Sequence, residues 1–271
     1  MATGRQGHLV RAVLEAVGRL RHRAAASVAP AVHAGVRLLA RDASQVVGAG
    51  KLLVVAPHPD DETIACGALL AASAARGLEP VVVCVTDGRY GLAGIEPDRC
   101  AEIRRSELAA SAEILGIAPG DVIMLGYEDS TVAAHVDELT EDLRRLVRQH
   151  EPRVLATSSL CDLHADHAAV ATAARRACRG SEIRLLEYVV WGWQHPVSWM
   201  MRLGGRRRLG RAVKVNASST NATKLEALAC YRSQVEPEGP LGPGFSSFFV
   251  QPHEVFFEPA ETPRRCCPAS R

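Results

Sequence analysis

Four side chains that can bind a metal ion or move a proton lie within five residues, directly after an apolar run. The segment VVAPHPDDETIACGALL (54–70) contains His58, Asp60, Asp61 and Glu62. Three carboxylates so close together repel one another unless a positive charge lies among them. A metal ion is the simplest source of that charge, and other parts of the chain must then supply the missing ligands.

A second cluster, in the segment CDLHADHAAV (161–170), contains His164, Asp166 and His167. Together, His58, Asp61 and His167 would offer two imidazole nitrogens and one carboxylate oxygen. Three protein ligands with an open fourth position are typical of catalytic zinc, whereas magnesium prefers more carboxylates. We therefore expect these three residues to bind zinc.

The other polar residues of the two clusters suit the remaining parts of a hydrolytic reaction. Asp60 is next to a predicted ligand and is the candidate general base for a metal-activated water molecule. His164 is the candidate for stabilising an oxyanion or protonating a leaving group, with Asp166 holding its tautomer. The two clusters together predict metal-dependent hydrolysis.

Alternating strand and helix patterns would position these clusters. Apolar runs predict strands over residues 51–56, 80–88, 121–126, 153–158 and 182–193. Helical patterns lie between them, over residues 63–77, 97–116, 132–150 and 167–179. Four consecutive strand–helix units with fully apolar strands predict an α/β fold, with a Rossmann-like, mostly parallel sheet and helices on both faces.

Every polar cluster follows the carboxyl end of a predicted strand. The first cluster follows the first strand, Asp87 the second, Asp129 the third and residues 162–167 the fourth. Ligands of parallel sheets bind outside the carboxyl ends of the strands. We therefore expect these side chains to line one site.

Residues 1–50 differ from the rest of the chain and predict an N-terminal helical extension. Apolar residues recur there at helical spacing among arginines: Leu9, Val13, Val17 and Leu20, then Val32, Val36 and Leu39 in a second helix. Such a basic amphipathic extension packs on the domain or docks on an anionic membrane surface. We expect it to precede a catalytic domain over residues 51–258 and a flexible tail over residues 259–271.

Another unusual segment, over residues 189–215, contains all three tryptophans: Trp191, Trp193 and Trp199. Met200, Met201 and several arginines follow. Trp and Met beside Arg suit a membrane interface, a flap over an amphiphilic substrate, or a packed surface insertion. No apolar run reaches the roughly 20 residues of a spanning helix.

Composition narrows the class of protein further. The net charge of +2 over 271 residues gives no argument for a nucleic-acid partner. The eight cysteines include no C-x-x-C pair, and no secretory signal is visible, which favours a reducing compartment. We expect a cytoplasmic protein, with peripheral attachment to the inner membrane face as the alternative.

The two clusters resemble the hallmark motifs of the LmbE-like, or PIG-L, family of zinc-dependent N-acetylglucosaminyl deacetylases. Those motifs stand here as Pro57-His58-Pro59-Asp60-Asp61-Glu62 and His164-Ala165-Asp166-His167. Thr86-Asp87-Gly88 and KLEALACYRSQ (224–234) add to the resemblance, which covers roughly residues 51–258.

The resemblance implies roles for individual residues. It implies His58, Asp61 and His167 as zinc ligands and Asp60 as general base. It implies His164 as the electrophilic or acid group, oriented by Asp166, and Arg104 and Asp129 as sugar contacts. The implied reaction removes the N-acetyl group from a small-molecule or lipid-linked amino sugar.

Two alternatives remain open. The same metal site could serve a mycothiol S-conjugate amidase, which cleaves an inner amide. A nucleotide-binding module is the alternative from another class, but GAGKLL (48–53) lacks the leading Gly and the Ser or Thr of a P-loop. Zinc content separates the enzymes from the module.

Overall fold

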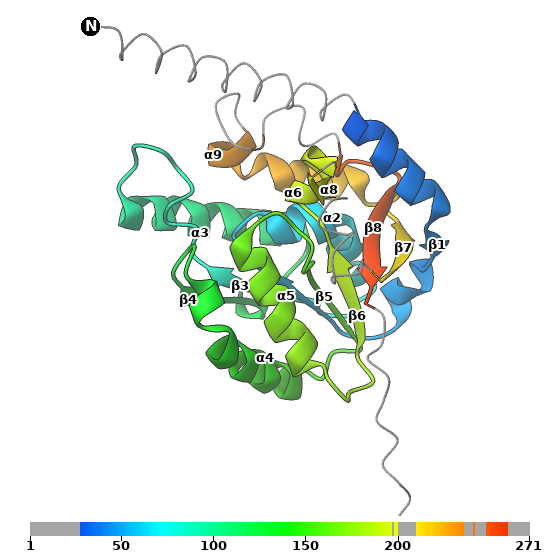
Figure 1. The fold of residues 1–271 in the computed structure, drawn as a ribbon, viewed down its shortest axis with the longest axis horizontal. Coiled ribbons are helices and arrows are strands. Elements are labelled where there is room, and N and C mark those ends of the chain that lie inside the picture. Colours follow the sequence, from blue (N-terminus) through cyan, green and yellow to red (C-terminus); the bar gives the residue numbers. More distant parts are fainter. Residues whose placement is uncertain (1–27, 197, 200–209, 236–240, 242–247, 260–271) are drawn as a thin grey trace, which may run out of the picture.

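A computed structural model describes residues 28–196, 198–199, 210–235, 241 and 248–259. In this part of the chain, eight strands form one sheet in the order β1-β7-β8-β6-β5-β2-β3-β4 (Figure 1). The strands are β1 (Arg41–Asp42), β2 (Leu52–Ala56), β3 (Val81–Thr86), β4 (Val122–Tyr127), β5 (Val154–Ser158), β6 (Arg184–Tyr188), β7 (Arg211–Asn216) and β8 (His253–Glu258). Strands β2 to β6 pair in parallel, and β8 runs antiparallel between β6 and β7. The predicted mostly parallel sheet is confirmed.

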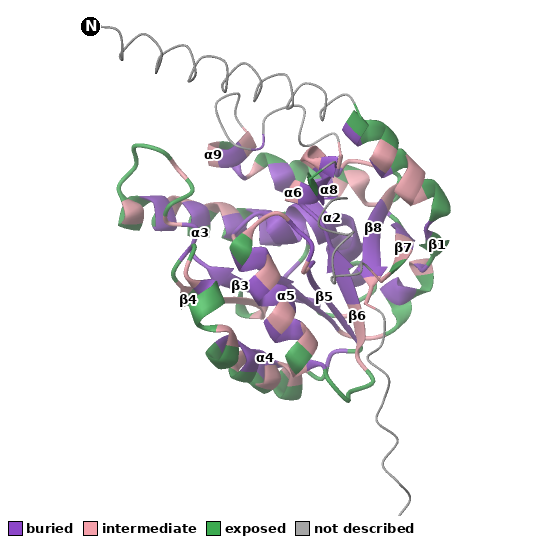
Figure 2. Cartoon of the chain, in the orientation of Figure 1, coloured by how far each residue is buried: buried purple, intermediate pink, exposed green. Residues whose placement is uncertain are grey.

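Helices cover both faces of the sheet, as predicted. They are α2 (Asp61–Ala74), α3 (Pro97–Ile114), α4 (Val136–His150), α5 (Ala165–Ala177), α6 (Trp191–Gln194), α8 (Asn221–Ala229) and α9 (Arg232–Val235), with short 3-10 helices η1 (Ser44–Gly48), η2 (Pro119–Asp121) and η3 (Val132–Ala134). Helices α2, α3 and α8 share one core, which contains Leu69, Leu108 and Leu228. Helices α4 and α5 share the other, which contains Leu143 and Val170. Figure 2 shows the sheet buried between these layers.

Strand β2 illustrates why the apolar runs become central strands. All of its residues are buried. Leu52 and Val54 join the core under α2, whereas Leu53 and Val55 join the core under α4 and α5. Successive strand side chains point to opposite faces, so a strand covered on both faces needs an unbroken apolar run.

The carboxyl ends of β2 and β5 are neighbours in the sheet. Val55 of β2 is paired with Thr157 of β5. Helix α2 begins at Asp61, soon after β2 ends, and α5 begins at Ala165, soon after β5 ends. The two polar clusters therefore lie side by side at one edge of the sheet.

The predicted strand over residues 182–193 is shorter in the structure, because β6 ends at Tyr188 and the helical turn α6 follows. The main-chain N–H groups of Val190 and Gly192 donate to the Asp162 carboxylate at 2.9 and 2.8 Å. These hydrogen bonds turn the chain away from the sheet and toward the second cluster.

The predicted helix over residues 132–150 is divided in the structure. Its first residues form η3, and the regular helix α4 begins only at Val136. Strands β1, β7 and β8 were not predicted. They extend the sheet beyond β6, where pairing between distant segments decides the structure and local pattern specifies it only weakly.

Residues 28–50, the described part of the predicted extension, pack against the sheet. Residues 28–39 are helical, and Val32 and Val36 contact the core. Leu39, predicted on the same face, is 84% exposed because the helix ends there and the chain turns into β1. Strand β1 pairs with β7, and Val47 is buried. The described residues before residue 50, the predicted boundary between extension and catalytic domain, therefore pack with the residues after it. The predicted helix over residues 1–27 lies outside the described residues.

Two of the three tryptophans are core residues. Trp193 and Trp199 are each 2% exposed, and their ring centroids lie 4.8 Å apart. Phe257 of β8 packs against both rings. Packing therefore accounts for these two side chains, whereas residues 200–209 and 260–271 lie outside the described part. No helix among the described residues is long and apolar enough to cross a membrane.

Candidate active site

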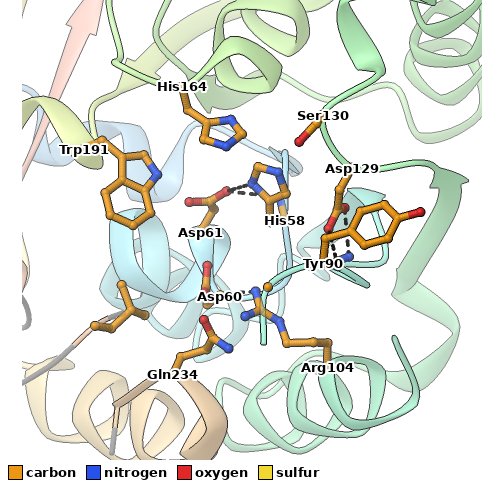
Figure 3. A pocket seen from close by; sticks show the side chains of 13 residues that line it. His58, Asp60, Asp61, Tyr90, Arg104, Asp129, Ser130, His164, Trp191 and Gln234 are labelled. Atoms are coloured by element: carbon orange, nitrogen blue, oxygen red, sulfur yellow. Dashed lines mark hydrogen bonds and ion pairs between the residues drawn. The ribbon is translucent and has the colours of Figure 1, made fainter. Parts of the chain in front are cut away.

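A cavity of about 210 Å³ opens at the carboxyl edge of the sheet (Figure 3). Its walls come from the loops after β2, β3, β4 and β5, together with α3, α6 and the chain around α9. The lining residues are His58, Asp60, Asp61, Gly88, Tyr90, Gly91, Arg104, Asp129, Ser130, His164, Trp191, Gln234 and Leu241. The structure thus brings most of the predicted site residues into one cavity.

The first cluster is shaped by the turn between β2 and α2. Asp60 has a backbone φ of 113°, which residues other than glycine rarely adopt. Its main-chain N–H donates to Glu62 Oε2 at 3.0 Å. Glu62 in turn accepts from Thr63 Oγ1 at 2.6 Å and from the Tyr231 hydroxyl. These contacts stabilise a backbone conformation that is strained in isolation.

Two imidazoles each have one ring nitrogen held by a carboxylate. His58 Nε2 lies 3.3 Å from Asp166 Oδ2, and His167 Nδ1 lies 2.8 Å from Asp162 Oδ2. When each of these nitrogens carries the proton, Nδ1 of His58 and Nε2 of His167 keep their lone pairs. Metal-binding histidines are commonly oriented by a carboxylate in this way.

The two remaining nitrogens converge on one carboxylate oxygen. Asp61 Oδ2 lies 3.3 Å from His58 Nδ1 and 3.2 Å from His167 Nε2. With zinc–ligand bonds of 2.0–2.1 Å, two ligands of a tetrahedral ion are about 3.3 Å apart. His167 Nε2 is buried and has no hydrogen-bond partner of good geometry among the described residues. The separation of Asp61 from each of the two imidazoles therefore suits a shared metal ion.

A second set of three donors overlaps the first. His58, His164 and His167 each offer a ring nitrogen, and these nitrogens lie within 4.8 Å of one another. Asp61 Oδ2 lies 3.3 and 3.2 Å from the two other donors, and His164 already accepts a hydrogen bond at Nδ1. We therefore favour Asp61 over His164 as the third ligand.

The carboxylates draw positive charge into the cluster. Burial alone would lower the pKa of His58, but its contacts with Asp166 and Asp61 raise that pKa to about 9. Burial would likewise lower the pKa of His167, but Asp61 and Asp162 raise it to about 10. A bound cation would balance the negative charge of these carboxylates in the same way, as the sequence predicts.

Asp60 stands apart from this group of donors. Burial raises the pKa of its carboxyl to about 7, although the Arg104 guanidinium, 3.1 Å away, favours the charged form. Arg104 is 3% exposed and also donates to the carbonyl of Pro59. The structure shows Arg104 positioning Asp60, and its predicted contact with a sugar remains a prediction.

His164 and Asp166 are arranged differently from the prediction. The main-chain N–H of Asp166 donates to His164 Nδ1 at 3.3 Å, so neutral His164 carries its proton on Nε2. The Asp166 carboxylate instead contacts His58 and accepts the N–H of Ser130 at 2.7 Å. Burial, then the nearby His167 and His58, lowers the pKa of His164 to about 4. His164 is therefore a neutral hydrogen-bond donor at the cavity wall.

Asp129 also has a structural task. Its carboxylate accepts the main-chain N–H groups of Gly88 at 3.1 Å and Tyr90 at 3.2 Å. Asp129 therefore fixes the loop after β3, which forms one wall of the cavity. A direct contact between Asp129 and a sugar remains a prediction.

Sequence reasoning missed several residues of the site. Asp162, which orients His167, is fully buried behind that imidazole. Tyr231 lies within the segment that resembles the family, yet nothing in its spacing indicates a contact with Glu62. Tyr90 and Trp191 line the cavity from loops whose local pattern carries no such signal.

Comparison with known proteins agrees with this geometry. Residues 53–178 match the family model "PIG-L: GlcNAc-PI de-N-acetylase". A 1D-myo-inositol 2-acetamido-2-deoxy-alpha-D-glucopyranoside deacetylase of Catenulispora acidiphila is 38% identical over 135 residues, covering 40% of this chain and 41% of the relative. A probable N-acetyl-alpha-D-glucosaminyl L-malate deacetylase of Bacillus cereus is 29% identical over 195 residues, covering 68% of this chain and 84% of the relative.

A solved structure extends the likeness to the whole fold. A conserved protein from Thermus thermophilus is 28% identical, with a TM-score of 0.59 over 81% of this chain and 98% of that one. The chain spans about two fifths of the length of the Catenulispora relative. The family match contains both motifs that build the site. Residues 53–178 of the chain therefore match the PIG-L, or LmbE-like, family.

Proposed function

We propose that the chain is a zinc-dependent hydrolase that removes the N-acetyl group from a glycoside containing N-acetylglucosamine. One observation carries the proposal. Asp61 Oδ2 lies 3.3 and 3.2 Å from two carboxylate-backed imidazoles, beside a second carboxylate, Asp60, that is not part of that set. The names of the Catenulispora and Bacillus relatives support the amino-sugar substrate.

His58, Asp61 and His167 would hold the zinc ion. Bound there, zinc would supply a Lewis acid that lowers the pKa of water to about 7 and polarises an amide carbonyl. Both imidazoles are oriented by Asp166 and Asp162, which keeps their lone pairs directed at the same place.

Asp60 would act as the general base. As water adds to the acetamide carbon, the Asp60 carboxylate accepts its proton, and a pKa of about 7 suits that transfer at neutral pH. Arg104 holds the carboxylate in place and keeps part of it ionised. The protonated Asp60 can then return the proton to the departing amine, so that the C–N bond breaks to give acetate and a free amine.

His164 would stabilise the charge that develops on the amide oxygen. Its Nε2 carries the proton because Nδ1 accepts a main-chain N–H. With its pKa lowered to about 4, His164 is neutral at pH 7 and acts as a hydrogen-bond donor rather than a strong acid. A donor placed in advance near a developing oxyanion lowers the barrier without reorganisation.

Location and substrate attachment are part of the same proposal. Cys66, Cys84 and Cys100 are buried thiols, which suits the reducing cytoplasm. We propose a small-molecule amino sugar as substrate. The lipid-linked substrate that the family resemblance implies remains a hypothesis. So does the membrane contact, since residues 1–27 and 200–209, which suggest it, lie outside the described residues.

The test is acetate release from a methyl glycoside of N-acetylglucosamine by the purified full chain. We expect release by the zinc-loaded protein, its loss after chelation, and its return when zinc is added back. A cysteinyl conjugate of the same amino sugar serves as the second substrate. Cleavage of that conjugate without acetate release from the glycoside would favour the amidase alternative, and no cleavage of either by folded, zinc-loaded protein would refute the proposal.

A further inference from the structure

Tyr90 is an exposed aromatic side chain that is held at both ends. It lines the cavity from the loop after β3 and is 55% exposed. Its main-chain N–H donates to Asp129 Oδ2 at 3.2 Å, and its hydroxyl donates to Glu128 Oε1 at 2.7 Å. A ring already fixed in this way loses little conformational entropy when a ligand packs on it.

The position of Tyr90 relates it to the outer part of a substrate. In Figure 3, Tyr90 and Trp191 lie on opposite sides of the His58–Asp61 pair. An acetamide would have to reach Asp60 and Asp61 at the centre. The group attached to the sugar, the aglycone, would then extend toward the cavity rim, where Tyr90 is exposed.

The rim beside Tyr90 is acidic. Glu128 is exposed, and no Lys or Arg side chain of the described residues forms an ion pair with Glu128 or Asp129. The neighbouring Arg89 is engaged with Asp87 at 2.7 Å. Arg104, the cationic residue of the described cavity wall, is buried against Asp60. At this rim an anionic aglycone would therefore meet the like charge of Glu128, which no Lys or Arg of the described residues pairs.

We propose that Tyr90 is a platform for a ring in the aglycone, and that Glu128 disfavours aglycones with negative charge. This inference rests on the proposed deacetylase function and narrows its substrate class. Aromatic rings and saturated rings such as cyclitols both present a C–H or π face to a tyrosine. Aromatic and saturated rings are alike in being uncharged here, and the experiment distinguishes them by comparing a phenyl with an inositol aglycone.

The experiment compares four glycosides of N-acetylglucosamine that differ only in the aglycone: methyl, phenyl, myo-inositol and malate. The measured quantity is kcat/KM for acetate release by the full, zinc-loaded chain. We expect phenyl or inositol glycosides to exceed the methyl glycoside by about two- to tenfold, the range of aromatic contacts. The malate glycoside should fall below the methyl glycoside.

Three variants assign the effects to residues. Tyr90→Leu should bring the ratio of ring-bearing to methyl substrates close to one, whereas Tyr90→Phe should keep most of it. Glu128→Gln retains an acceptor for the Tyr90 hydroxyl but removes the charge, so the ratio of malate to methyl should rise about two- to fivefold. Ile95→Ala, at a 44% exposed apolar residue of the same loop outside the cavity wall, is the matched control.

The outcomes separate this inference from the proposed function. A malate glycoside that matches the ring-bearing substrates, or ratios that Tyr90→Leu leaves unchanged, would overturn the inference while the deacetylase function stands. If no glycoside releases acetate, the proposed function fails. In that case, calorimetry gives the dissociation constants of the phenyl and methyl glycosides for wild-type protein and for Tyr90→Leu. The ratio of the two constants still decides whether Tyr90 binds a ring.

Discussion

The two motif segments of the site are held in different ways. The first motif segment, residues 57–62, depends on distant parts of the chain: Arg104 of α3 fixes Asp60, and Tyr231 fixes Glu62. In the second motif segment, residues 159–167, His167 is oriented from within by Asp162, which in turn accepts the main-chain N–H groups of Val190 and Gly192. The second segment thus carries the carboxylate that orients its own proposed ligand, whereas the carboxylate that orients His58 comes from another segment.

The two segments also complete each other. Asp166 of the second segment reaches His58 of the first, and Asp61 of the first lies between His58 and His167. The site is therefore one unit made from two loops. Variants that remove one contact at a time can show how far the segments depend on each other.

Removal of a proposed ligand from either segment should have the largest effect. Asp61→Ala and His167→Ala should each reduce zinc from about one ion per chain to almost none, because a three-ligand site loses a third of its donors. Elemental analysis of purified protein measures the content. Asp137→Ala, at an exposed carboxylate on α4 far from the cluster, is the control. Full zinc content in either ligand variant would show that the ligand set is wrong.

Asp60→Asn should separate chemistry from metal binding within the first segment. The amide cannot accept the proton of water, so kcat should fall about a hundredfold or more, as loss of a general base typically does. Zinc content should stay at the wild-type level, since Asp60 is outside the ligand set. Near-normal kcat would give the role of base to another group.

Asp162 orients His167 within its own segment, whereas Asp166 orients His58 of the other segment. The variants Asp162→Asn and Asp166→Asn compare these two contacts. Either change should weaken zinc affinity about 10- to 100-fold, as loss of an orienting carboxylate does. Asp162 also accepts the N–H groups of Val190 and Gly192, so Asp162→Asn should lower the free energy of unfolding by about 1–3 kcal/mol. Zinc titration and urea unfolding measure the two effects. Equal losses of stability in both variants would contradict the difference between the segments.

Tyr231→Phe should have the smallest effect of the series. It removes the hydroxyl that donates to Glu62, which still accepts from Thr63 and the main chain of Asp60. We expect kcat to fall by about threefold, in line with the loss of one hydrogen bond, with zinc content unchanged. A loss as large as that of Asp60→Asn would mean that the first segment depends on this contact far more than the geometry indicates.

Local patterns in the sequence predicted the parts of the molecule that local physics decides. The unbroken apolar runs of β2 and β5 require burial on both faces, and the polar residues that follow them must then share one edge. The zinc ligands stay a prediction, made because two imidazoles and a carboxylate favour zinc. These inferences need no knowledge of which distant residues meet.

Contacts between distant segments could not be predicted in the same way. The Asp166 carboxylate is close to His164 in the sequence motif, yet it turns to His58 because the β2 and β5 loops are neighbours in the sheet. The contact of Arg104 with Asp60 joins α3 to the loop after β2, and no local pattern indicated it. Trp193 and Trp199 look like surface anchors in a basic segment but pack on β8, a strand that no local pattern indicated.

The proposed ligand set is tested most directly at His164, the third imidazole of the cluster. We assign zinc to His58, Asp61 and His167 and expect His164 to act on the substrate. Zinc content and acetate release are measured together on the His164→Ala variant and on wild-type protein. We expect about one zinc ion per chain in both, as in a single three-ligand site, with acetate release strongly reduced in the variant. Loss of zinc from His164→Ala, to the level expected for His167→Ala, would place the metal among the three imidazoles and show that Asp61 is not the third ligand.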